Sequence, residues 1–167
     1  VASNINSSSV DISWTAGGTE TAWNLEYGAA GFTQGSGTVV NVSTNPYSMT
    51  GLTANTAYDV YLQSDCGSGD VSAWVGPISF TTACLTVSTL PFTETFEDAS
   101  TTRSCWTNIQ EAGTSNWTYG SGSSGGSITS AFNGTKNAVF VSAFGTIITK
   151  LVSPIMDLSS LTTPRVS

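Results

Sequence analysis

Residues 9–14 read Ser-Val-Asp-Ile-Ser-Trp, and this stretch decides the fold of the first half of the chain. Apolar Val10, Ile12 and Trp14 alternate with polar residues, which is the period of a strand that buries one face. Further short runs, separated by turn residues, repeat this alternation or are rich in β-branched residues, at 23–27, 38–42, 47–49, 57–64 and 78–82. Short strands at this spacing, with no helical period between them, predict a β-sandwich.

The composition of the 167-residue chain excludes several classes of function. It has no histidine, which rules out a Ser-His-Asp triad, a Cys-His dyad and a His-ligated zinc. A net charge of −7 with only four basic residues argues against nucleic-acid binding. No stretch approaches the roughly 18 apolar residues of a membrane span. Only 9% of the residues are charged, so serine, threonine, asparagine and glycine must solubilise the chain, as is common in extracellular β-proteins.

The charged residues are unevenly distributed along the chain. Residues 84–167 contain both acids and all four bases, whereas residues 1–83 contain acids only. This shift predicts a boundary near Cys84, with one domain at 1–83 and a second at 84–167. The acids of the first segment are Asp11, Glu20, Glu26, Asp59, Asp65 and Asp70.

The first segment resembles a fibronectin type III domain over residues 1–83. Residues 9–14 are similar to that family's second strand, which makes Trp14 its buried core tryptophan. Residues 52–58, Leu-Thr-Ala-Asn-Thr-Ala-Tyr, resemble the family's Leu-x-x-x-Thr-x-Tyr segment, so Tyr58 is expected to form the tyrosine corner. Residues 65–77 resemble a subtype common in secreted bacterial proteins. A cysteine and a proline expected just before the first strand do not occur, so we expect this domain to lack its opening residues.

The second segment resembles the opening half of MAM-like jelly rolls, close to the choice-of-anchor J and cleaved-adhesin domains of bacterial surface proteins. Such domains are about twice as long, so we expect a jelly-roll β-sandwich that is incomplete. Strands are predicted at 90–97, 137–143 and 147–152, with a flexible stretch at 120–130 that is rich in glycine and serine. The residues that carry the resemblance are Phe96-Glu97, Cys105-Trp106, Trp117, 134–138 and 151–154.

The chain has three cysteines, Cys66, Cys84 and Cys105, and the predicted strands limit which of them can form a disulfide. Cys66 and Cys84 follow the sixth and seventh strands, so they lie at opposite ends of an antiparallel hairpin, on the order of 20 Å apart. A disulfide needs Cα atoms within about 7 Å, which disfavours a Cys66–Cys84 bond. The MAM-like resemblance implies instead that Cys84 pairs with Cys105, which suits an oxidising compartment. Three free thiols are the alternative, and the partner of Cys66 stays open.

Carboxylates are the one source of catalytic chemistry in this chain. Glu94 and Glu97 have opposite parity on the predicted strand, so they would face opposite sides and could not share a cleft. We therefore expect no enzyme activity. Calcium, which the adhesin resemblance implies, would use Glu97 first, then Asp98 and Asp157. Solvated or capping carboxylates are an equally good interpretation.

The function predicted from the sequence is that of a non-catalytic extracellular module of a secreted or cell-surface bacterial protein. It would act in adhesion or as a structural stalk or fibre element. Its partners would be a protein or glycan surface ligand, or neighbouring modules or subunits. The alternative is an accessory region, with some capacity for carbohydrate binding, of a large secreted hydrolase such as a protease. None of the five tryptophans is a clear surface platform for a sugar ring.

Overall fold

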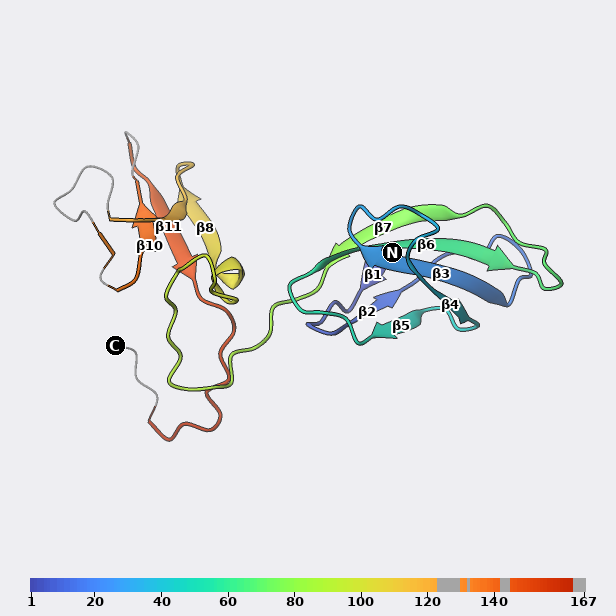
Figure 1. The fold of residues 1–167 in the computed structure, drawn as a ribbon, viewed down its shortest axis with the longest axis horizontal. Coiled ribbons are helices and arrows are strands. Elements are labelled where there is room, and N and C mark those ends of the chain that lie inside the picture. The colour runs from blue at the N-terminus through green and yellow to red at the C-terminus, as the bar shows by residue number, and fades with distance from the viewer. Residues whose placement is uncertain (123–129, 132, 142–144, 164–167) are drawn as a thin grey trace. The chain divides into compact units, whose positions relative to one another are not determined.

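The fold is all-β apart from a short 3-10 turn in the residues that the structure describes, which are 1–122, 130–131, 133–141 and 145–163. The structure is a computed structural model, drawn as a ribbon in Figure 1. The chain divides into two units, Val1–Cys84 and Leu85–Ser167, and each is described by itself.

The first unit is a sandwich of two antiparallel sheets (Figure 1). One sheet has the order β1 (Ala2–Ser3), β2 (Ser9–Ile12), β5 (Tyr47–Thr50). The other has the order β4 (Thr38–Val42), β3 (Ala22–Ala29), β6 (Ala57–Asp65), β7 (Val75–Thr81). Both sheets contribute alternate apolar residues to one core, which explains the period-2 pattern of the sequence. The core residues are Val10, Ile12, Trp23, Leu25, Val42, Met49, Leu52, Val60 and Phe80.

Trp14 and Tyr58 were both predicted as structural core residues, and the structure places them differently. The hydroxyl of Tyr58 accepts a hydrogen bond from the backbone N–H of Thr53 at 3.0 Å, which is the geometry of a tyrosine corner. Trp14 lies just beyond the end of β2 and is only partly buried against the core. Trp23 is the deeply buried tryptophan, at 6% exposure, and the two indoles meet edge to face at 5.1 Å.

Glu26 shows a feature that strand alternation does not predict. It lies on β3 between Leu25 and Tyr27, yet it is completely buried under the loop that joins β3 to β4. Its carboxylate accepts hydrogen bonds from the N–H groups of Gly35 and Gly37, at 2.8 and 2.6 Å, and from the Gln34 amide. Burial acts to raise the pKa of Glu26, but the hydrogen bonds outweigh it and hold the pKa below its usual value.

The second unit contains two separate two-stranded antiparallel sheets. β8 (Thr107–Ala112) pairs with β11 (Ile148–Val152), and β9 (Trp117–Gly120) pairs with β10 (Asn137–Phe140). The 3-10 turn η1 (Arg103–Cys105) precedes β8. An aromatic cluster packs beside it, because the ring of Phe96 lies 5.2 Å from Trp106 and 5.4 Å from Tyr119.

One prediction for this unit was wrong, and one strand was not predicted. The predicted strand at 90–97 does not form, because Phe96 has a φ of 58° and its N–H folds back onto the Glu94 carboxylate at 2.8 Å. β8 was not predicted, because all of its residues except Ala112 are exposed and no apolar alternation marks it. β10 ends at Phe140, and the remainder of the strand predicted to residue 143 lies mostly outside the described residues, as does most of 120–130.

Cys84 and Cys105 are joined by a disulfide, which is the pair that the MAM-like resemblance implies. Cys66 is free and exposed, in a tight turn where its N–H bonds to the carbonyl oxygen of Asp70 at 2.9 Å. A disulfide of this kind suits an oxidising, extracellular compartment. Among the described residues, no helix has the length and hydropathy needed to cross a membrane.

Candidate functional site

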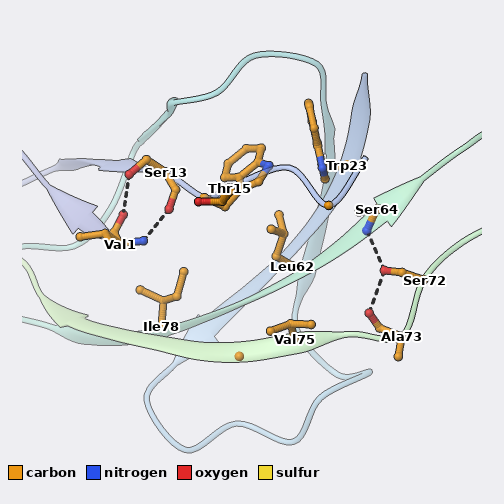
Figure 2. A pocket seen from close by; sticks show the side chains of 13 residues that line it. Val1, Ser13, Thr15, Trp23, Leu62, Ser64, Ser72, Ala73, Val75 and Ile78 are labelled. Carbon is orange, nitrogen blue, oxygen red and sulfur yellow. Dashed lines mark hydrogen bonds between the residues drawn. The ribbon is translucent and has the colours of Figure 1, made fainter. Parts of the chain in front are cut away.

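A pocket of about 720 Å³ in the first unit is the main candidate site (Figure 2). Three segments build most of its walls: residues 13–15 after β2, Leu62 and Ser64 in the second half of β6, and residues 72–78, which lead into β7. Asn45 fixes the first wall, since its side chain accepts from the N–H of Trp14 and donates to the carbonyl oxygen of the same residue at 2.7 Å. The second and third walls are held by the pairing of β6 with β7.

The side chains that line this pocket are uncharged and largely apolar, while the α-amino group of Val1, which also lines it, donates to the carbonyl oxygen of Ser13. None of the described side chains that line it is acidic or basic. Figure 2 shows Leu62, Ile78 and Val75 along one side, and Val75 is 69% exposed at the rim. The hydroxyl of Ser72 accepts from the N–H of Ser64 at 2.9 Å and donates to the carbonyl oxygen of Ala73 at 2.8 Å. Such a surface can hold an uncharged, mainly apolar group.

The two indoles at this pocket are unusual in their hydrogen bonding. The Nε1 atoms of Trp14 and Trp23 are buried and have no hydrogen-bond partner among the described residues. Their rings meet edge to face, with an interplanar angle of 66°. Edge-to-face contact is a favourable arrangement for two aromatic rings, and it stabilises this wall of the pocket.

A second candidate lies around Glu97 in the other unit. The Oε1 atom of Glu97 accepts from the N–H groups of Thr135 and Lys136, at 2.6 and 2.8 Å. Its Oε2 atom accepts from the Thr135 hydroxyl. Gly134 has a φ of 77°, and a Cβ atom there would lie 2.4 Å from Oε1, so only glycine allows this close approach. Glu97 therefore ties residues 134–136 to the segment that follows Phe96.

Asp98 is held by the two cations nearest to it. Its carboxylate lies 2.7 Å from Arg103 and 2.9 Å from Lys136. Hydrogen bonds from Lys136 and Arg103 lower the pKa of Asp98, and hydrogen bonds from Thr135 and Lys136 lower the pKa of Glu97. Both carboxylates are therefore ionised at neutral pH and serve as acceptors within the fold.

The three residues expected to bind calcium, Glu97, Asp98 and Asp157, are all engaged in hydrogen bonds or ion pairs within the protein. Both oxygens of Glu97 are occupied, and Asp98 lies beside two positive charges that repel a cation. Asp157 instead accepts from the N–H of Ser159 at 2.9 Å. Asn137 Oδ1 is a buried acceptor without a partner in the described part of the chain, but calcium needs at least six oxygens. The described residues contain no group of three acids or cysteines placed to hold a metal. Calcium binding stays an untested prediction.

The candidate carboxylate pair for catalysis is likewise engaged in the fold. Glu94 accepts from the Thr102 hydroxyl at 2.6 Å and from the Trp106 indole at 3.1 Å. Glu97 binds different groups, on residues 135 and 136. Residues 90–97 form no strand, so strand parity does not decide which way Glu94 and Glu97 face. The two carboxylates nevertheless have separate structural roles.

Most residues of both candidate sites could not be recognised as site residues from the sequence. Arg103 and Lys136 are isolated bases in the sequence, and nothing in their spacing predicts that both reach Asp98. Leu62 belongs to a predicted strand whose alternation indicates packing, and Val75 precedes the strand predicted at 78–82, so neither gives a sign of a pocket. The one available signal was Gly134, which lies in a segment that carried the MAM-like resemblance.

The comparison with protein families concerns the first unit. Residues 1–81 match the family model of the fibronectin type III domain. The match supports the resemblance seen at residues 9–14 and 52–58, and the MAM-like resemblance of the second unit remains a prediction. A search of curated proteins found no match to the chain.

Proposed function

We propose that this chain, whose residues 1–81 form a fibronectin type III domain, acts in adhesion or as a structural stalk or fibre element of a secreted or cell-surface bacterial protein. Fibronectin type III domains are typically non-catalytic extracellular modules that mediate protein interactions. The Cys84–Cys105 disulfide supports the extracellular part of the proposal.

The observation that carries the binding part is the largely apolar pocket beside Trp14. A recess of about 720 Å³ that is open at Val75 can accept a side chain or a small group from a partner. The described side chains that line it are uncharged, and the α-amino group of Val1 already donates to the carbonyl oxygen of Ser13, so an uncharged apolar ligand loses the least hydration there. We infer that an apolar peptide side chain is a better ligand than a charged glycan.

The test is a binding screen with the purified chain immobilised at low density. Extracellular proteins and neutral glycans are passed over the surface, and the same substrates are checked for hydrolysis. Val75→Trp fills the pocket rim and is expected to weaken binding at least tenfold. Thr81→Trp is the matched control, because Thr81 is exposed on the same strand but does not line the pocket.

Three results would count against this proposal. Equal binding by both variants would show that the pocket is not the contact site. Failure to bind any extracellular protein or neutral glycan would remove the adhesive role. Turnover of a peptide or glycan substrate by the purified chain would overturn the non-catalytic assignment.

A further inference from the structure

We propose that Asn133 is a site of spontaneous covalent modification, at which its side-chain amide condenses with the backbone nitrogen of Gly134 and is converted to aspartate or isoaspartate. The conversion loosens the contact between Glu97 and residues 134–136. This inference does not depend on the pocket of the first unit or on the proposed function. It starts from the sequence of the segment that Glu97 binds.

Asn133 is the one asparagine of this sequence that is followed by glycine. A side chain on the following residue hinders the approach of its backbone nitrogen to the asparagine amide, and glycine has no side chain. The fold also requires glycine at position 134, because a Cβ atom there would collide with the Oε1 atom of Glu97. The contact that holds this segment therefore places the most reactive neighbour next to Asn133.

The reaction balances with water as its only co-reactant. The nitrogen of Gly134 forms a bond with Cγ of Asn133, the bond from Cγ to Nδ2 breaks, and Nδ2 leaves as ammonia with the proton that the Gly134 nitrogen gives up. Water then opens the succinimide ring. Attack at Cγ breaks the new bond and gives aspartate. Attack at the main-chain carbonyl carbon of residue 133 breaks its bond to the Gly134 nitrogen, which stays on Cγ, and gives isoaspartate.

Both reacting groups are accessible and unengaged in the fold. Asn133 and Gly134 are exposed and lie in a bend, and β10 begins only at Asn137, so its pairing with β9 does not have to break before the ring closes. Among the described residues, neither the Asn133 amide nor the Gly134 N–H has a hydrogen-bond partner. Asn133 also lines a recess of about 390 Å³ beside Glu94 and Phe96, through which water reaches the ring.

Asn108 and Asn116 of the same unit provide a natural comparison. Each is followed by a bulky residue, Ile109 or Trp117. The side chain of Asn108 accepts from the N–H of Trp117 at 2.8 Å and donates to the carbonyl oxygen of the same residue at 3.2 Å. The side chain of Asn116 accepts from the Gln110 amide at 2.9 Å. These bonds hold both side chains in place, so we expect ring closure there to be slower.

Isoaspartate adds one carbon to the main chain directly before Gly134. The N–H groups of Thr135 and Lys136 reach Oε1 of Glu97 at 2.6 and 2.8 Å, and the Thr135 hydroxyl reaches Oε2. Hydrogen bonds weaken steeply away from such geometry, so a displaced main chain loses part of this set. Both products also place a new negative charge on the segment that contacts Glu97, and like charges repel.

The test is incubation of the full chain at mildly alkaline pH, which promotes loss of the Gly134 proton, followed by reduction, digestion with trypsin and mass spectrometry. The peptide 104–136 contains Asn108, Asn116 and Asn133, so two of its asparagines are internal controls. A sample digested without incubation sets the zero point. We expect Asn133 to convert at least tenfold faster than either control, with isoaspartate among the products. Conversion of Asn133 no faster than the controls would overturn the proposal.

Two matched variants locate the reacting residue. Asn133→Gln should stop the gain of negative charge during incubation, because glutamine must close a larger and slower-forming ring. Asn116→Gln makes the same change elsewhere in the peptide and should leave the conversion of Asn133 at its wild-type rate. Equal gain of charge in the two variants would overturn the assignment to Asn133.

The structural consequence is measured on the wild-type sequence, without any variant. Anion exchange separates converted chains, which carry one more negative charge, from unconverted ones. Hydrogen exchange of the Thr135 amide, followed by NMR, should be faster in the converted fraction, because this amide loses its bond to Glu97. Equal exchange in the two fractions would overturn the claim that the conversion loosens this contact.

Discussion

Replacing Leu25 by alanine tests whether the sandwich core described above holds the first unit together. Leu25 is completely buried in β3, where it pairs with Val40 of β4 and Leu62 of β6. The substitution removes three side-chain carbons from the centre of the four-stranded sheet. The neighbours are fixed by backbone pairing on both sides, so they cannot close the cavity.

The expected loss follows from burial and position. Leu→Ala substitutions in packed cores cost about 2–5 kcal/mol, and a site that cannot collapse lies in the upper part of that range. For a unit of roughly 80 residues, each kcal/mol lowers the melting temperature by about 4–8 °C. We therefore expect the melting temperature of the first unit to fall by roughly 12 °C or more.

The assay is thermal unfolding followed by circular dichroism, with hydrogen exchange to assign the transition to the first unit. Val39→Ala is the control, because Val39 lies on the neighbouring strand but is 56% exposed, and its loss should change stability by no more than about 0.5 kcal/mol. If Leu25→Ala lowered the melting temperature by no more than the control does, the core assignment would be refuted.

Other perturbations test the remaining contacts. Tyr58→Phe should destabilise the first unit by about 1 kcal/mol in denaturant titrations, because the Thr53 N–H loses its acceptor. Gly134→Ala should lower the melting temperature of the second unit and raise the exchange of the Thr135 amide, because its Cβ would collide with Glu97; unchanged exchange would contradict the contact. In the folded protein the pKa values of Glu26, Glu97 and Asp98 lie below those of the unfolded chain, which are near about 4. The three ionised carboxylates therefore stabilise the fold fully above the unfolded pKa values, and this stabilisation is lost as the pH falls through the lower folded values. Melting temperatures should therefore fall with acidity below about pH 4, and a rise there would contradict the hydrogen-bond assignments.

The sequence predicts the sandwich because burial there follows local periodicity. Alternation at Val10 and Ile12, and at Trp23 and Leu25, places those side chains in the core that the structure shows. Glu26 breaks the pattern, since its burial depends on a loop closing over it, with Gly28 and Gly37 making room for Phe32. No window of local sequence contains that information.

The second unit is harder to predict for a related reason. Its polar contacts join residues far apart in the chain, as when Glu97 binds Thr135, and no periodicity accompanies such a contact. The run at 90–97 has the alternation of a strand, yet the bond from the Phe96 N–H to Glu94 turns it into a bend. Side-chain bonds to nearby backbone compete with strand formation, and here they prevail.

The placement of the basic residues has a consequence for digestion by trypsin-like proteases, which cleave after lysine or arginine. The first basic residue of this sequence is Arg103, so residues 1–81, which match the fibronectin type III domain, contain no such cleavage point, whether they are folded or unfolded. The first two cleavage points after the domain are Arg103 and Lys136, and the ion pairs of both side chains with Asp98 restrain them. The resistance of the domain to these proteases therefore follows from its lack of lysine and arginine and does not depend on its stability.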